Sequence, residues 1–428
     1  LMEIAFRDVN DGSIIEVSQV ASRGGREGSE NDPALLVDEP DTMPEYPSYY
    51  NSTYFDEIYH ARTGYEHANG LSTYEWTHPP LGKVLMMFAI KIFGMTPFGW
   101  RFMGTLMGVL MVPAMYMLGK LLFKKTRYAF LAAFVMAFDM MHLTQTRIAT
   151  IDSFAVLFII LMYLCMFRYM QMSFFRDGWK TLIPLGLSGL FMGLGCASKW
   201  ICMYAGAGLA VLFAWTMVQR FLEWRAGMQA GGEMAEKVAG YPRYLVGTLL
   251  ACILFFLAIP FAIYYFSYIP QFAWEGGLTW NRFWETQKSI FSYHANLVDD
   301  HAFQSPWYEW PLMLKPMYYY SGTTYAAKGM VSTIMAMGNP AVWWVGFVAF
   351  IYVVWRWMKP HILREQVEDH RPALILLAFA AQFLPWVLVP RSTFIYHYFG
   401  SLPFVMLCIV YAAEQLYKSN DLRAKIIQ

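Results

Sequence analysis

Residues 151–170 read IDSFAVLFIILMYLCMFRYM, a mostly apolar run whose charges lie near its two ends. A run of about twenty residues is the length that an α-helix needs to cross the hydrocarbon core of a bilayer. Similar runs recur along the chain, which is 57% hydrophobic and 15% charged overall. The sequence therefore predicts an all-α protein that crosses a membrane several times.

We expect about nine such spans, over residues 98–122, 128–146, 151–170, 181–198, 201–219, 244–268, 341–357, 372–389 and 394–415. Two shorter helices should precede them. Thr53 is a candidate N-cap for a helix over 54–68, which would stop at Asn69-Gly70. Pro79-Pro80 should open a second helix ending near Gly94. These helices are too short to span a bilayer, so we expect them to lie along its interface.

Basic residues divide the two sides of the membrane. When nine spans alternate, one side receives most of the cations that flank them, and the positive-inside rule makes that side cytoplasmic. These cations are Lys120, Lys124, Lys125, Arg127, Arg168, Arg176, Lys180, Arg220, Arg225, Lys237, Arg243, Arg356, Lys359, Arg364, Arg371, Lys418, Arg423 and Lys425. The other side receives residues 1–97, three tight turns and a long loop.

Those three turns carry one cation each, Arg147, Lys199 and Arg391. Each has an ordinary explanation, such as a snorkelling side chain, or for Arg147 an ion pair with Asp152. Three cations placed against the topological bias are better explained by an anionic ligand. A phosphate fits, because it accepts charge-assisted hydrogen bonds from Arg and Lys.

Acids fall on the same side. Asp56 and Glu57 are adjacent carboxylates at the predicted start of a helix, and one of them could deprotonate a hydroxyl nucleophile. The alternative is a capping box with Thr53, since acids favour a helix N-terminus. Glu57-x-x-His60 could also be half of a metal site, although one such pair is weak support.

The segment His78-Pro79-Pro80-Leu81-Gly82-Lys83 follows on this side. Its prolines fix a turn and open a helix, and Lys83 could simply snorkel. The functional alternative places His78 and Lys83 beside the acids. The late loop is rich in Trp and Tyr and also carries His294. It could be a structural cover or could contact a sugar substrate.

We divide the chain into five parts: an extracytoplasmic hairpin and linker over 1–50, the first external loop over 51–97, six spans over 98–268, an aromatic external loop over 269–340, and three spans with a short tail over 341–428. The hairpin should run from Ile4 to Val17 around Asn10-Asp11-Gly12. Because the chain begins at Leu1 without a signal peptide, we expect it to be a fragment with a span missing upstream. The net charge of +1 argues against a nucleic-acid binder.

Taken in order, these pieces resemble the protein O-mannosyltransferase family, membrane glycosyltransferases of the C-type fold. The resemblance rests on Asp56-Glu57, on His78 to Lys83, on Arg147 with Asp152, on Gly193 to Trp200, and on Arg391 with Tyr396-His397-Tyr398. Ser292-Tyr293-His294 and Trp310-Pro311-Leu312 in the late loop belong to the same set.

The resemblance implies an inverting transfer of mannose from a polyprenyl-phosphate carrier to a Ser or Thr hydroxyl of a protein. Asp56 would be the base and Glu57 would orient the acceptor, while Arg147 and Arg391 would hold the donor phosphate. Lys199 joins them as the third cation placed against the topological bias. Supporting roles fall to His78, Lys83, Asp152, His294, Tyr396 and His397. The expected partners are the lipid-linked donor, the protein acceptor and membrane lipids, with no cofactor, metal or nucleic acid. The protein would be a multi-pass component of the cell membrane, with its site on the extracytoplasmic face.

Three other functions stay open at this point. Another C-type transferase could move a different sugar from polyprenyl phosphate to a lipid or glycan. A transporter is a weaker alternative, because its polar site should lie near the bilayer midplane between repeated halves. An inactive assembly subunit would lose no activity when Asp56 changes.

Overall fold

The computed structural model describes residues 4–20, 37, 40, 48–297, 301–322 and 329–427. It contains two compact units, one over residues 1–54 with 322–332 and a helical one over the rest of the chain. In the first unit, β1 (Phe6–Arg7) pairs with β2 (Ile14–Ile15) antiparallel, with Phe6 opposite Ile15. Gly12 has a φ of 74°, as a tight hairpin turn requires. The expected hairpin is confirmed; most of the expected linker lies outside the described residues.

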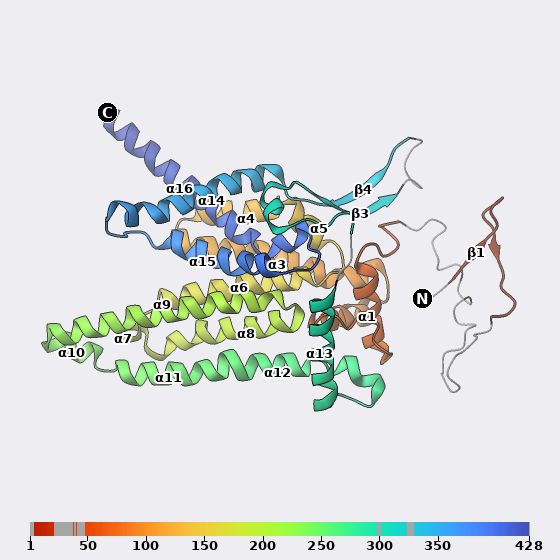
Figure 1. Ribbon diagram of the computed structural model, residues 1–428, viewed down its shortest axis with the longest axis horizontal. Coiled ribbons are helices and arrows are strands. Elements are labelled where there is room, and N and C mark those ends of the chain that lie inside the picture. Colours follow the sequence, from red (N-terminus) through yellow and green to blue (C-terminus); the bar gives the residue numbers. More distant parts are fainter. Residues whose placement is uncertain are drawn as a thin grey trace. The chain divides into compact units, whose positions relative to one another are not determined.

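The second unit is helical (Figure 1). Its α-helices are α1 (Glu57–Asn69), α2 (Leu81–Phe93), α3 (Pro97–Phe123), α4 (Thr126–Ala137), α5 (Met140–Thr146), α6 (Asp152–Met170), α7 (Phe174–Asp177), α8 (Leu182–Ser198), α9 (Ile201–Ala230), α10 (Gly232–Val238), α11 (Tyr241–Ile253), α12 (Ile259–Phe266), α13 (Trp280–Asn296), α14 (Pro340–Leu363), α15 (Arg371–Phe383) and α16 (Leu402–Ile427). A π-helical segment, η4 (Leu254–Ala258), joins α11 to α12 without a break. The other connections include the 3-10 turns η3 (Gly178–Thr181), η5 (Pro270–Glu275), η6 (Trp307–Leu312), η7 (Leu384–Leu388) and η8 (Ile395–Gly400) and the strands β3 (Met317–Gly322) and β4 (Ser332–Ala336).

Seven of the expected spans correspond to helical stretches that are long and apolar enough to cross a membrane. The second expected span, 128–146, is instead broken at Asp139 into α4 and α5. Asp139 is buried there, and its carboxylate accepts hydrogen bonds from the backbone N–H of His142 and from the indole N–H of Trp343. The ninth expected span begins with the 3-10 turn η8 and continues as α16. The protein is thus a multi-pass helical membrane protein.

The helix α6 is the most buried of these spans and packs against α3, α8 and α9. The stretch from Gly232 to Phe266 is at the other extreme, with only 6% of its most apolar window buried. Its backbone packs closely against Gly189 of α8. A Cβ added at Gly189 would lie only 2.2 Å from the Phe255 carbonyl oxygen, so only glycine fits there. Small residues allow this kind of contact between helices in a membrane.

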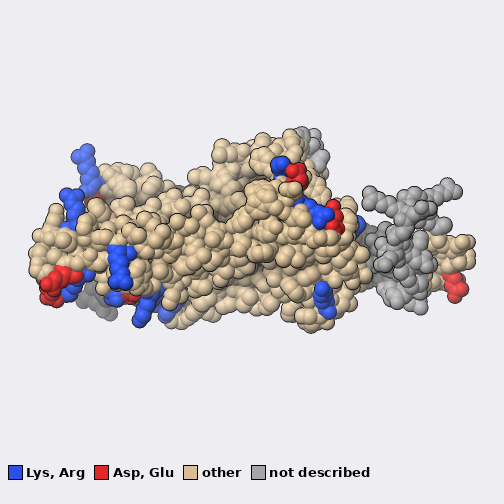
Figure 2. All heavy atoms as spheres, turned by 90° about the horizontal axis from the view of Figure 1, so that it is seen from below, with Lys and Arg blue, Asp and Glu red and all other residues tan. Residues whose placement is uncertain are grey.

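The basic loops gather at one end of the helical unit. The guanidinium of Arg371, at the start of α15, lies 2.7 Å from the Glu414 carboxylate of α16 and 5.3 Å from the Phe123 ring at the end of α3. In α6, Arg168 lies at this end and Asp152 at the other. Figure 2 shows a wide band with almost no charged side chains between the two ends, as expected where lipid tails surround a protein.

Candidate active site

The first turn of α1 differs from the expectation. The helix begins at Glu57 and not at residue 54, so Thr53 does not cap it; Asp56 occupies the N-cap position without a side-chain capping bond. The preceding residue, Phe55, has a φ of 54°, which is uncommon for a bulky side chain and is strained. Its ring stacks on Tyr319 of β3 with 3.8 Å between centroids and meets the edge of Tyr396 at 6.0 Å. This packing holds the backbone from which the Asp56 side chain projects.

The Asp56 carboxyl lies among charged groups of three other segments. Burial raises its pKa to about 6, against the opposing pull of Lys199, and the negative charges of Asp152 and Glu75 act in the same direction as burial. No hydrogen bond or ion pair of this carboxylate is found within the described part of the chain. A carboxylate with a pKa near neutrality and open oxygens can accept a proton from a bound hydroxyl.

Glu57 has a different setting from its neighbour. It is fully buried, and its carboxylate binds Arg101 of α3 through two hydrogen bonds of 2.8 Å. It also accepts the backbone N–H of Ala149 at 3.1 Å. These contacts tie α1 to α3 and to the turn before α6, so Glu57 holds the Asp56 segment in place. Its predicted contact with an acceptor stays a prediction.

An ion pair joins the first turn of α6 to the end of α8. The Nζ of Lys199 lies 2.7 Å from Oδ1 of Asp152, and both side chains are 10% exposed. The sequence left open a pair between Asp152 and Arg147, but Lys199 is the partner of Asp152 here. Arg147 is exposed at the C-terminal end of α5, in the turn whose Ala149 binds Glu57.

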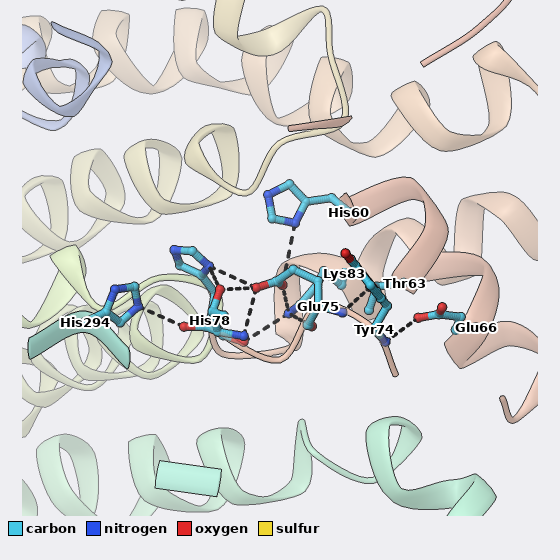
Figure 3. A network of polar contacts seen from close by, with 9 residues as sticks. His60, Thr63, Glu66, Tyr74, Glu75, His78, Lys83 and His294 are labelled. Atoms are coloured by element: carbon cyan, nitrogen blue, oxygen red, sulfur yellow. Dashed lines mark hydrogen bonds and ion pairs between the residues drawn. The ribbon is translucent and has the colours of Figure 1, made fainter. Parts of the chain in front are cut away.

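A buried network surrounds Glu75, a residue that the sequence analysis did not select (Figure 3). Lys83, which has no exposed surface, donates to the Glu75 carboxylate, and also to the carbonyl oxygens of Glu75 at 2.8 Å and His78 at 3.1 Å. His78 Nδ1 lies 3.2 Å and His60 Nδ1 3.9 Å from the same carboxylate. Lys83 is therefore a buried clasp that folds the loop before α2 onto itself, and not a snorkelling side chain.

Burial and neighbouring charges determine the protonation of Glu75, His60 and His78. Burial opposes ionisation of Glu75, but the Lys83 ammonium holds the pKa of this carboxyl well below its usual range. Burial lowers the pKa of His60 to about 3 and lowers the pKa of His78 as well. Glu75 is thus ionised, and both histidines are neutral at physiological pH. One signal could have found Glu75: it is an acid eight residues before Lys83, with a double proline turning the chain between them.

Next to this network lies a cavity of about 260 Å³. Its polar lining comes from His78, Lys199, His294 and Arg391, which belong to four separate segments, and much of the rest is apolar, including Trp386 and Leu388. Positive side chains at one part and apolar walls elsewhere suit a ligand with a phosphate and a hydrocarbon chain. Arg147 does not line this cavity.

His294 connects α13 to the cavity. Its Nε2 lies 2.9 Å from the Thr77 carbonyl oxygen and so donates to it, while its Nδ1 has no partner within the described residues. Burial lowers the pKa of His294 to about 4, helped by nearby positive charge, so the ring is neutral and Nδ1 is an acceptor. A ligand hydroxyl could bind there.

The two remaining candidates belong to η8. His397 is buried, and its Nδ1 accepts the backbone N–H of Phe394 at 2.9 Å, which shapes the turn. The Tyr396 ring lies 5.9 Å from the Lys199 ammonium, within cation–π range. Of the expected site residues, the structure thus gathers Asp56, His78, Asp152, Lys199, His294, Arg391, Tyr396 and His397 in one region. Within the described residues, no group of three or more His, Cys, Asp or Glu is placed to hold a metal ion.

Comparison with known proteins shows which family has a similar sequence. A model of the dolichyl-phosphate-mannose-protein mannosyltransferase family matches residues 89–274, and a model of the C-terminal four-span region of protein-O-mannosyltransferase matches 279–427. The polyprenol-phosphate-mannose–protein mannosyltransferase of Mycolicibacterium smegmatis is 26% identical over 80% of this chain and 72% of the relative. The protein of the same name in Corynebacterium glutamicum is 24% identical over 79% and 71%.

Solved structures agree on the fold. The Saccharomyces cerevisiae protein O-mannosyltransferase Pmt1–Pmt2 complex bound to the sugar donor matches with a TM-score of 0.67 at 14% identity, over 85% of this chain and 82% of that one. ArnT from Cupriavidus metallidurans in the apo state matches with a TM-score of 0.54, also at 14% identity, over 85% and 55%.

Fold and family models together define a membrane glycosyltransferase, with its charged site at one end of a multi-pass helical bundle. The chain belongs to the protein O-mannosyltransferase family.

Proposed function

We propose that this protein transfers mannose from a polyprenyl-phosphate-mannose donor to Ser or Thr hydroxyls of proteins, with inversion, at the extracytoplasmic face of the cell membrane. The names of its mycobacterial and corynebacterial relatives support the donor and the protein acceptor. The sidedness is supported by the basic loops, which lie at the end opposite Asp152 and are expected to face the cytoplasm.

The observation that carries this proposal is the setting of Asp56. As the acceptor oxygen bonds to the anomeric carbon, its proton passes to the Asp56 carboxylate. The bond from that carbon to the phosphate oxygen breaks, and the phosphate leaves with the electron pair. Attack on the face opposite the leaving group inverts the configuration. A pKa of about 6 leaves Asp56 ionised at neutral pH yet basic enough to take the proton.

We assign the leaving phosphate to the cavity lined by Lys199, the cation whose charge acts on Asp56. Lys199 and Arg391 would neutralise the charge that develops on it, and the apolar wall near Trp386 and Leu388 would hold the lipid chain. Arg147 would approach the phosphate from outside the cavity, since it lies exposed on the neighbouring turn. Neutral His294 offers an acceptor for a sugar hydroxyl.

The remaining residues support these groups. Asp152 orients Lys199, Lys83 and His78 shape the loop beside the cavity, and Tyr396 and His397 belong to the turn after Arg391. Glu57 fixes the segment that carries Asp56, and it would orient the acceptor through that position rather than through an open carboxylate oxygen.

The test is a transfer assay in membranes, with labelled polyprenyl-phosphate mannose and a Ser/Thr peptide. We expect label on the peptide, a loss of about 10²- to 10⁴-fold in Asp56→Asn, and a weaker loss in Arg391→Ala. Asp177→Asn, which removes a carboxylate paired with Arg176 at the opposite end, is the matched control and should keep full activity. Label that arrives in lipid or glycan would support a different transferase, and unchanged transfer in Asp56→Asn would overturn the assigned base.

A further inference from the structure

A second cavity lies at the end of the helical unit opposite Asp56. It is an open groove of about 680 Å³ between α3, α6 and α8. We call it the basic groove and define it by four cations, Lys120, Lys124, Arg168 and Lys180, and by two apolar residues of its wall, Leu164 and Leu187. The transfer chemistry proposed above uses none of these residues. Figure 2 shows basic side chains gathered at this end, where α7 and α10 lie in Figure 1.

Two cations of the basic groove bind neutral groups, and none of the four has an ion pair with a carboxylate within the described residues. Lys124 Nζ donates to the Gln171 amide oxygen at 2.6 Å, and Lys120 Nζ donates to the Thr126 hydroxyl at 2.8 Å. Arg168 makes no hydrogen bond or ion pair within the described residues. Its charge acts on the Asp177 carboxylate from a distance, but Asp177 is already paired with Arg176 at 2.9 Å. No carboxylate lines the described groove.

Two of these cations, Lys124 and Arg168, are close enough to repel each other. Partial burial lowers the pKa of Lys124, and the positive charge of Arg168 lowers it further. Like charges gathered without a carboxylate cost free energy, and a bound anion would remove that cost. The positive-inside rule and the negative C-terminal ends of α3 and α6 account for single cations at these positions. They do not account for an apolar groove opening beside them.

We propose that the basic groove binds one anionic phospholipid of the cytoplasmic leaflet, with its phosphate between Lys120, Lys124 and Arg168 and an acyl chain along the wall of Leu164 and Leu187. Basic pockets between membrane-spanning helices suit anionic headgroups, and the apolar wall excludes a free phosphate as the full ligand. The lipid would join the ends of α3, α6 and α8. Because α6 carries Asp152 at its far end, the bound lipid would also stabilise the helix that supports the site.

The probe is phosphatidylglycerol, with phosphatidylcholine as the neutral lipid, added to the full chain purified in detergent. Native mass spectrometry counts the retained lipid. We expect one phosphatidylglycerol per protein and no retained phosphatidylcholine. The groove variant Lys120→Gln, Lys124→Gln, Arg168→Gln should bind phosphatidylglycerol about a hundredfold more weakly, as expected for the loss of three cations near a lipid headgroup.

Two further variants separate a built site from general surface charge. Lys125→Gln, Lys359→Gln, Arg225→Gln removes the same number and kinds of cation outside the basic groove and should keep the lipid. Leu187→Trp keeps every charge but places a larger side chain where the acyl chain would lie. This variant should lose the lipid, while the elution volume and helical content of the protein stay unchanged. Equal retention by the groove variant and its control, retention by Leu187→Trp, or equal binding of phosphatidylcholine would overturn the proposal. Glycerol phosphate alone should not compete.

Discussion

Lys199 and Asp152 form an ion pair of 2.7 Å between the end of α8 and the first turn of α6, and the charges of both act on the Asp56 carboxyl. Lys199 lowers the pKa of Asp56 and Asp152 raises it. Burial is the main cause of the raised pKa of Asp56, and the two charges of the ion pair shift this pKa in opposite directions without a hydrogen bond to Asp56. Changing either member should move the working pH range of the enzyme in a direction that the geometry fixes.

The first prediction concerns the pH profile of the wild-type enzyme. Asp56 must be ionised to accept a proton, and its pKa is about 6. We expect kcat/KM for peptide mannosylation to fall about tenfold per pH unit below pH 6 and to level off above pH 7. A profile that stays flat down to pH 5 would contradict the assignment of Asp56 as the base.

The second prediction uses the ion pair. Lys199→Met removes the charge that lowers the pKa of Asp56, so the acid limb should move above pH 6. Asp152→Asn removes a charge that raises this pKa, so the limb should move below pH 6. Both variants will be slower overall, and the measurement is therefore the midpoint of the limb and not the maximal rate. Shifts of the same sign in both variants would argue that the limb belongs to another group.

The third prediction concerns stability. The folded pKa of Asp56 lies above its unfolded value, so ionised Asp56 destabilises the fold. This penalty is fully present above pH 6 and shrinks as the pH falls toward 3.8, because the folded state then binds the extra proton. Asp56→Asn should raise the free energy of unfolding by up to about 3 kcal/mol at pH 8 and by less at pH 5. Thermal unfolding in detergent at the two pH values measures the difference; Asp177→Asn, at the opposite end, should show no such gain.

The fourth prediction concerns the buried clasp between Lys83 and Glu75. Lys83→Met leaves a buried carboxylate without its cation and should destabilise the protein by about 3–5 kcal/mol. Adding Glu75→Gln should recover most of that loss, since the two changes together remove both charges. Additive losses in the double variant, measured by thermal unfolding, would show that the two residues are not coupled. Lys288→Met, which breaks an exposed pair with Glu285, is the control and should change stability by less than about 1 kcal/mol.

Sequence periodicity predicted most of the fold, because an apolar run of sufficient length has few alternatives to a membrane-spanning helix. It did not predict the break within 128–146, where α4 ends before Asp139 and α5 begins after it. The reason lies far along the chain: the indole N–H of Trp343 and the backbone N–H of Asn339 both bind the Asp139 carboxylate. Such long-range partners are invisible to any local pattern. An Asp at that position reads locally as a costly interruption of a span.

The candidate site was predictable where its residues broke the topological charge bias, as Lys199 and Arg391 did. It was not predictable where ordinary polar residues find partners only in the fold. In the sequence Glu75 is an ordinary loop residue, and only the fold shows that Lys83 donates to its carboxylate. Likewise, the sequence does not distinguish Glu57 from Asp56, whereas in the fold Arg101 donates to both carboxylate oxygens of Glu57. Two adjacent carboxylates thus have different surroundings, a distinction that composition and spacing do not contain.

Phe55, whose backbone is strained, connects two parts of the chain that are far apart in the sequence. Its ring stacks on Tyr319, and Tyr319 belongs to β3 in the loop between α13 and α14. An exchange of that loop between relatives would also exchange the aromatic contact that holds the backbone next to Asp56. Chimeras that keep an aromatic residue at position 319 should therefore retain turnover more often than those that do not, whatever the rest of the graft contains.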